Sequence, residues 1–168
     1  MNKQILKSTL IAAAGLLFAN SAMAADTATT TFQVTATVAD SCLVSATDLN
    51  FGAYDPAAVK DGTSKITVTC TAQTPYTIGL DAGTGTSAVT TRAMTGSVGA
   101  STQLVYELYT ETNRTSVWGD IGGTSGTTVA NSSLAGGALD YIVYGQIPAS
   151  QYVPAANYAD TITVTVDY

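Results

Sequence analysis

Few side chains in this 168-residue protein could carry acid–base chemistry, and histidine is absent altogether. Without histidine the chain lacks the commonest general base of enzymes and the commonest metal ligand. Glu107 and Glu111 form a closely spaced carboxylate pair, but residues four apart in a strand lie too far apart to act on one glycosidic bond. We interpret both as solvated carboxylates at a strand edge, and we expect no catalytic site, no metal and no cofactor.

Two other features could bind a ligand. The stretch "GDIGGTSGTT" (119–128) is rich in glycine but has no lysine to hold a phosphate, which favours a flexible loop. Four aromatic residues, Trp118, Tyr109, Tyr144 and Tyr152, could form a stacking platform for a sugar or a host surface. Large aromatic residues near strand ends more often cover a small core, and we favour that interpretation.

The first 24 residues are typical of a secretory signal peptide. Lys3 and Lys7 precede an apolar stretch over residues 10–19, which is too short to span a membrane as a helix. The small residues Ala22 and Ala24 suit cleavage after Ala24. We therefore expect an exported protein that begins at Ala25 and forms one domain.

The net charge argues against one class of partner, and the two cysteines indicate a disulfide. Four basic residues remain after the signal against all twelve acidic ones, a formal net charge of −8 that makes nucleic acid an unsuitable partner. Cys42 and Cys70 are the only cysteines, and exported proteins meet an oxidising compartment. We predict that they form a disulfide, which would stabilise the fold by about 3–4 kcal/mol through its closed loop.

Alternating apolar and polar residues predict half-buried strands, with no convincing helical periodicity after the signal. The expected strands are residues 64–71, 75–81, 102–110, 139–147 and 158–168. Turn-rich pieces separate them at residues 55–63, 81–88 and 119–138. The chain is therefore expected to be all-β, as a sandwich of two antiparallel sheets or, as an alternative, a closed barrel.

The last of these expected strands, residues 158–168, has a free side that needs to be covered. Its inner row comprises Ile162, Val164, Val166 and Tyr168, and no later segment follows in the sequence to cover its free side. An uncovered edge beside an apolar groove invites another strand. We expect such a groove here.

The stretch "TTTFQVTATVADSC" (29–42) is a strand of the kind that this edge could accept. Its polar row alternates with a second row made of Thr30, Phe32, Val34, Ala36 and Val38. Alternation places the second row on one face, so these side chains must pack on a core.

The order and spacing of several motifs resemble the spore coat protein U domain family, which includes pilin subunits of archaic chaperone-usher pili. The motifs are "FQVTATVADSCLV" (32–44), "DLNFGAYDP" (48–56), "ITVTCT" (66–71), "PYTIGLDAG" (75–83), "RAM" (92–94), "LVYELYTE" (104–111), "VWGD" (117–120), "YGQIPASQ" (144–151) and "YADTITVTVDY" (158–168). The resemblance covers nearly the full length of the chain.

The resemblance implies a six-stranded, incomplete immunoglobulin-like sandwich whose missing strand is supplied by another protein. Residues 25–38 would be a donor strand, and residues 39–168 the pilin domain with its acceptor groove beside the C-terminal strand. A periplasmic chaperone would lend a strand first. An outer-membrane usher would then exchange that strand for the donor of the next copy or of a related pilin.

The implied function is a structural subunit of a cell-surface pilus, secreted through the periplasm and supporting attachment and biofilm formation. A spore or cell coat protein assembled in the same way is an alternative. A further alternative is an adhesive binding module of the same fold. The resemblance implies two domains and no donor extension for tip adhesins of the family, whereas this chain is expected to have one domain and the extension. A secreted enzyme is the weakest candidate.

Overall fold

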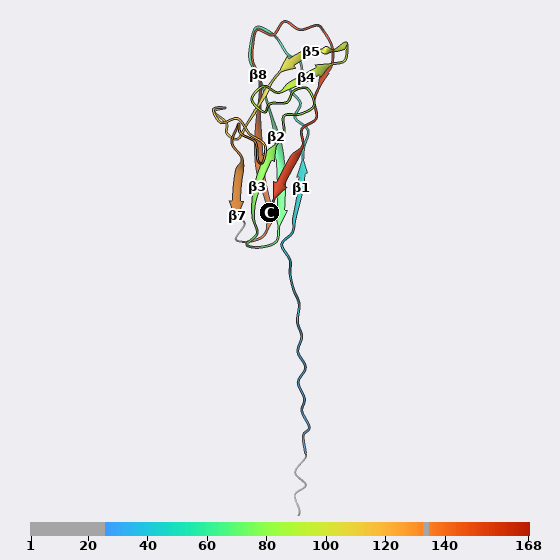
Figure 1. Ribbon diagram of the computed structural model, residues 1–168, viewed down its shortest axis with the longest axis vertical. Helices are drawn as coiled ribbons and strands as arrows, with labels where there is room; N and C mark the ends of the chain where they lie inside the picture. Colours follow the sequence, from blue (N-terminus) through green and yellow to red (C-terminus); the bar gives the residue numbers. More distant parts are fainter. Residues whose placement is uncertain (1–25, 133–134) are drawn as a thin grey trace, which may run out of the picture. The chain divides into compact units, whose positions relative to one another are not determined.

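The structure, a computed structural model, describes residues 26–132 and 135–168 (Figure 1). The expected signal, residues 1–24, lies outside the described residues. The chain divides into two units, Met1–Ala36 and Thr37–Tyr168. In the first unit, residues 26–36 form no helix or strand, and all their side chains are exposed. The described ranges also hold no helix that could cross a membrane.

A four-stranded antiparallel sheet forms one layer of the second unit. Its alternation follows the sequence, because Ile66, Val68 and Cys70 are buried while Thr69 on the opposite face is exposed. The strand order is β1 (Cys42–Ala46), β2 (Lys60–Cys70), β8 (Gly137–Ile147) and β6 (Glu107–Tyr109).

Two three-stranded sheets make up the rest of the domain. The first has the order β10 (Val164–Asp167), β3 (Pro75–Leu80) and β7 (Val129–Ser132). The second has the order β5 (Gly99–Val105), β4 (Ala93–Gly96) and β9 (Tyr158–Ala159), and in Figure 1 its strands β4 and β5 lie at the upper end of the domain.

The core lies between the inner faces of the sheets. Ile66 and Val143 from the four-stranded sheet belong to one buried cluster with Ile78 and Leu80 of β3, and Trp118 joins it. The predicted all-β class is confirmed, and the sheets pack as separate layers with open edges. The described residues contain ten strands where six were expected, because two expected strands are each divided and because β4 and β7 were not expected.

Two expected strands are each divided between sheets. The expected strand 102–110 is interrupted at the buried Tyr106, which separates β5 from β6. The expected strand 158–168 is divided into β9 and β10, because β9 pairs with β4 while β10 pairs with β3. The prediction of single continuous strands was wrong at both places.

Two turn-rich pieces contain strands that the sequence pattern did not indicate. β2 begins at Lys60, within the piece 55–63, because its first residues pair with the end of β8. β7 lies within the piece 119–138 and pairs with β3. The stretch 119–128 is also tied down rather than free, since Thr127 donates its N–H to the carbonyl of Val117 at 2.7 Å.

Candidate functional site

An apolar groove of about 1160 Å³ opens into the core of the second unit. One wall is formed by residues 46–54 and the other by residues 153–164. The floor consists of core side chains that a closed sandwich would cover. They are Ile66, Leu80, Leu104, Tyr106, Leu108, Val143 and Ile147.

β1, which reaches the first wall at Ala46, leaves half of its backbone groups free at its outer edge. It is the outer strand of its sheet, and just beyond it Thr47 donates its N–H to the carbonyl of Lys65 at 2.9 Å. Hydrogen-bonded and non-bonded residue pairs alternate in an antiparallel ladder. The N–H and C=O groups of Val44 and Ala46, like those of Cys42, therefore point away from β2.

β10 presents the same arrangement on the second wall. It is the outer strand of its sheet, and Asp81 donates its N–H to the carbonyl of Thr163 at 3.1 Å. By the same alternation, the backbone groups of Val164 and Val166 point away from β3. Figure 1 shows β1 (cyan) and β10 (red) running in opposite directions.

The structure places the four expected groove residues of the last strand differently. Ile162 and Val164 line the groove. Val166 packs against the core without lining the groove. Tyr168 was expected on the same inner row, but it lies beyond β10 and its side chain is 58% exposed.

A pair of glycines anchors the first wall. Gly62 and Gly145 face each other across β2 and β8, and a Cβ on either would come within 3.0 Å of Leu49 and Phe51 side-chain atoms. The two side chains therefore lie directly on the backbone of the sheet. Strand periodicity could not have indicated this contact, because residues 47–56 form no strand.

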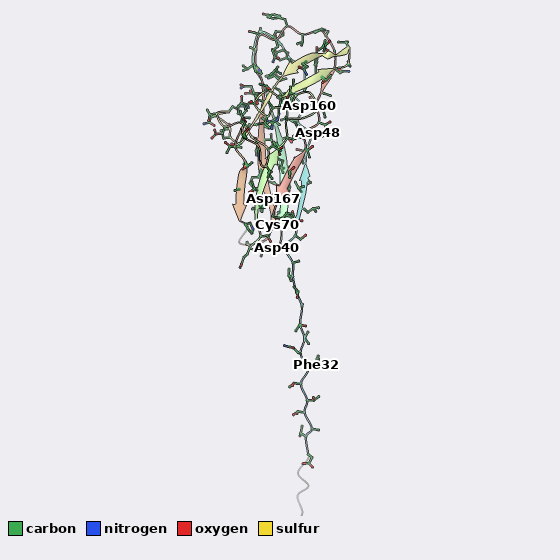
Figure 2. The ribbon with its side chains drawn as sticks, in the orientation of Figure 1. Phe32, Asp40, Asp48, Cys70, Asp160 and Asp167 are labelled. Carbon is green, nitrogen blue, oxygen red and sulfur yellow. A yellow bond between two sulfur atoms is a disulfide. The ribbon has the colours of Figure 1, made fainter. Side chains whose placement is uncertain are left out.

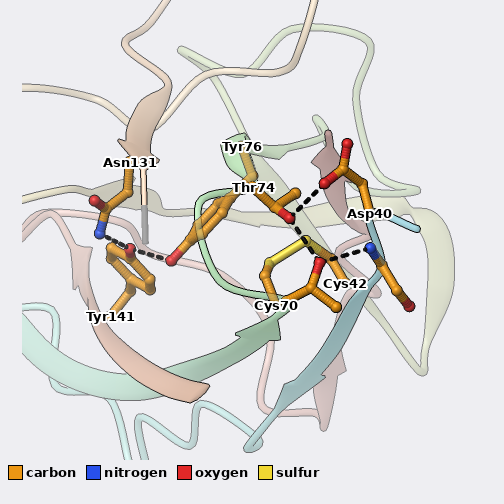
Figure 3. Close-up of a disulfide and its surroundings, with 9 residues drawn as sticks. Asp40, Cys42, Cys70, Thr74, Tyr76, Asn131 and Tyr141 are labelled. Carbon is orange, nitrogen blue, oxygen red and sulfur yellow. Dashed lines mark hydrogen bonds between the residues drawn. A yellow bond between two sulfur atoms is a disulfide. The ribbon is translucent and has the colours of Figure 1, made fainter. Parts of the chain in front are cut away.

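A disulfide joins the start of β1 to the end of β2, as the sequence predicts (Figure 3). Cys42 and Cys70 face each other in a non-hydrogen-bonded pair, where the Cα atoms of antiparallel strands come closest, and here they are 4.1 Å apart. Beside it, the buried Thr74 donates its hydroxyl to Asp40 at 2.9 Å. The first strand of the domain is thus pinned at its beginning.

A second polar cluster closes the same end of the core (Figure 3). The Tyr76 and Tyr141 hydroxyls are 2.6 Å apart, and Asn131 donates to Tyr141 at 2.6 Å. Burial, together with the bond to Tyr141, raises the pKa of Tyr76 above its usual range. Tyr76 is therefore a neutral structural group.

The predicted donor row is exposed throughout. Phe32 is 85% exposed (Figure 2), Val34 81% and Val38 83%, and Thr30 and Ala36 are exposed as well. These residues belong to no strand. Large apolar side chains at alternate positions are costly to leave in water.

The structure places the other candidate residues in different surroundings, with Tyr109 and Tyr144 opposite each other on β6 and β8. Trp118 is buried and donates its Nε1–H to the carbonyl of Ile78 at 3.2 Å, which agrees with the core interpretation, while Tyr152 is 85% exposed. Glu107 was expected to be solvated, but its Oε2 atom is buried without a hydrogen-bond partner and burial raises its pKa to about 7. Within 26–132 and 135–168, no three metal-binding side chains come together.

Sequence comparison identifies the family. The model of the spore coat protein U domain matches residues 28–165, a stretch that contains both groove walls and the whole exposed row. This chain belongs to the spore coat protein U domain family. The resemblance expected from the motifs is confirmed.

Two known proteins are informative relatives. The chain is 35% identical to Protein U of Myxococcus xanthus over 175 residues, covering 94% of each chain. It also resembles a solved complex of CsuC and CsuE, a chaperone and a tip adhesion subunit of archaic chaperone-usher Csu pili of Acinetobacter baumannii. The TM-score is 0.57 and the identity 27%, over 79% of this chain and 40% of the solved one.

Proposed function

We propose that this protein is a structural subunit of a surface pilus, assembled through the chaperone-usher pathway by donor-strand exchange. The observation that carries the proposal is the groove with a free strand edge on each wall. Ala46 on one side and Val164 on the other line the groove and have backbone groups that point away from their sheets, and the free strand edges continue at Val44 and Val166. Such an arrangement accepts an added strand.

The proposed occupant is the segment 25–38 of a second copy. Its row of Thr30, Phe32, Val34, Ala36 and Val38 has the spacing of a strand with one face buried. Burying Phe32 or Val34 in the groove would contribute about 1.5–3 kcal/mol for each side chain. The polar row that includes Gln33 would face solvent.

Strand capture in this proposal requires the groove to widen. Neighbouring strands lie about 4.8 Å apart, so a strand inserted between two others needs about 9.6 Å. Cα atoms of β1 and β10 approach within 8 Å of each other without pairing. The two strands therefore move apart as the donor enters.

The family membership and the Csu pilus likeness support the rest of the pathway. Residues 1–24 would direct export, a periplasmic chaperone would cover the groove of domain 39–168, and an usher would exchange the chaperone for the next donor. The finished fibre would serve surface attachment and biofilm formation. No step of this assembly requires an enzymatic activity of the subunit.

A coat protein is the second candidate, and one observation favours it. The similarity to Protein U spans nearly the whole of both chains, whereas the chain covers 40% of the solved pilus protein. A coat subunit could use the same groove and donor. Genes for a chaperone and an usher next to the gene for this protein would favour the pilus.

The test replaces single residues of the donor segment. Phe32→Asp would bury an unpaired carboxylate in the neighbour's groove, which costs several kcal/mol, and should prevent polymerisation while leaving the acceptor domain folded. Gln33→Ser, on the polar row, should polymerise like the wild type. Size-exclusion chromatography and electron microscopy measure assembly, and circular dichroism measures folding. Equal assembly of the two variants would refute the donor assignment.

A further inference from the structure

One carboxylate lies in the second groove wall, where the chain passes from β9 to β10. Asp160 (Figure 2) lines the groove, and its Oδ1 atom accepts hydrogen bonds from the Thr84 N–H at 2.7 Å, the Thr84 hydroxyl at 2.8 Å and the Thr161 N–H at 2.8 Å. Its Oδ2 atom accepts a bond from the Tyr106 hydroxyl at 2.8 Å. The four donor groups belong to Thr84, which follows β3, to the neighbouring Thr161 and to Tyr106 of the groove floor.

Tyr106 connects Asp160 with the opposite groove wall across the floor. Its side chain is buried, and its ring packs edge-on against Phe51 of the first wall, with ring centroids 6.2 Å apart. The hydroxyl at the other end of the ring reaches Asp160. A single rigid side chain therefore links the two walls, and Asp160 fixes one end of the link.

The fold makes room for the Asp160 carboxylate at Gly83. A Cβ on Gly83 would lie 2.2 Å from Oδ2 of Asp160, and its φ of +77° is in the region that favours glycine. Three residues further along the wall, Thr163 donates its N–H to Asp81 Oδ1 at 2.9 Å. The irregular segment 160–163 is thus held at both ends to the turn that follows β3.

We propose that Asp160 is a positioning residue for strand capture, which holds residues 158–163 against Tyr106 so that this part of the groove wall is already ordered when β1 and β10 move apart. The inference rests on the proposed function. A wall that is ordered before binding spares the incoming strand the cost of ordering it. Because four donors surround the carboxylate, an inserted strand can cover it without leaving an unpaired charge.

The experiment measures capture of a fluorescent peptide of residues 25–38 by the full chain, at concentrations too low for polymerisation. Asp160→Ala should lower the association rate about tenfold, since it removes charge-assisted bonds. Asp160→Asn should stay within about threefold of the wild type, because its amide can still bond with Thr84, Thr161 and the Tyr106 hydroxyl. The matched control, Asp167→Ala, removes an exposed carboxylate from β10 and should bind at the wild-type rate.

Stopped-flow fluorescence separates positioning from a general loss of stability. A merely structural role would lower the urea midpoint without changing the association rate, and this result would overturn the inference. An alanine variant that binds at the wild-type rate, or an asparagine variant as slow as alanine, would do so too. If Asp160→Ala does not fold, Tyr106→Phe removes one bond of the same cluster and should slow capture about threefold; an unchanged rate there counts against the inference.

The two proposals fail in different ways. A wild-type protein that captures no peptide contradicts donor-strand exchange itself. A wild-type protein that captures the peptide, together with an Asp160→Ala protein that captures it equally fast, contradicts only the role given to Asp160.

Discussion

Arg92 is a fully buried cation whose hydrogen bonds all go to main-chain carbonyl groups. Its guanidinium donates to Asp81 and Val89, and one nitrogen bonds to both Leu80 at 2.9 Å and Trp118 at 2.8 Å. Burial lowers its pKa, although nearby acidic groups oppose the shift. This side chain joins the end of β3, beside the β10 wall, to the buried tryptophan, and the planar five-donor group of arginine suits that task where lysine would not.

Glu107 is the residue from which a pH dependence is expected. Burial raises its pKa from 4.5 to about 7, against the opposing charge and backbone N–H of Arg92. Between these values the folded protein keeps a proton that the unfolded chain has released, so the free energy of unfolding should fall as the pH rises through this interval. The Glu107→Gln protein should lack this pH-dependent fall in the free energy of unfolding. Urea unfolding between pH 5 and pH 8 measures it.

The control for this prediction is Glu111→Gln. Hydrogen bonds from Thr115 and Ser116 hold the pKa of Glu111 below its usual range, so its charge stays constant over the same pH interval. The free energy of unfolding of the Glu111→Gln protein should therefore change with pH between pH 5 and pH 8 as that of the wild type does. If the curve of Glu107→Gln were also parallel, the pH dependence assigned to Glu107 would be incorrect.

At the scale of elements, the disulfide is expected to stabilise β1 most, because few other contacts hold this strand. It pairs with β2 alone, and its other edge faces the groove. Replacing Cys42 and Cys70 by serine should lower the free energy of unfolding by about 3–4 kcal/mol and increase amide exchange in β1. Intact-mass analysis of the exported protein with an alkylating reagent, before and after reduction, establishes the bond; two thiols that react before reduction would refute it.

Elements with a strong period of two could be predicted from sequence, and those formed by distant pairing could not. The expected strand 139–147 became β8 almost unchanged, because alternation reports one buried face directly. β7 was missed because Gly- and Ser-rich surroundings hid a strand that forms by pairing with β3. In the segment 160–163 the alternation continues while the backbone leaves the sheet, since the ties to Asp81 and Asp160 outweigh the local pattern.

In the candidate site, too, local alternation predicted some residues, while contacts between distant segments could not be predicted. Alternation put Ile162 and Val164 on the inner row of the last expected strand, and in the structure both line the groove. Phe51, Tyr106 and Asp160 were not expected there as a group, because they are far apart in sequence and meet only through the packing of separate sheets. Local patterns carry no information about such contacts.

At the scale of the whole molecule, the proposed donor and acceptor occupy separate parts of the chain. Deleting residues 25–36 should leave the acceptor domain folded, because the groove and the core lie within the second unit. Such a protein could accept a strand but not donate one. Added in small amounts to the full chain, it should cap growing fibres and shorten them in electron micrographs.

The matched control for the deletion is the same truncated protein carrying Val164→Asp, which places a charge in its groove. It should be unable to accept a donor and should leave fibre length unchanged. If the truncated protein with an intact groove also left fibre length unchanged, donor and acceptor would not be separable as proposed.

The free backbone groups on β1 and β10 have a mechanical consequence for the proposed fibre. A donor strand would be hydrogen-bonded along both of its sides, and it continues directly into the next domain of the fibre. Tension would therefore pull it along its own axis, loading its hydrogen bonds in shear and all together instead of peeling them apart one by one. The fibre's resistance to flow would then come from main-chain groups that every residue carries, so it should hardly depend on salt or on the surface charge of the subunits.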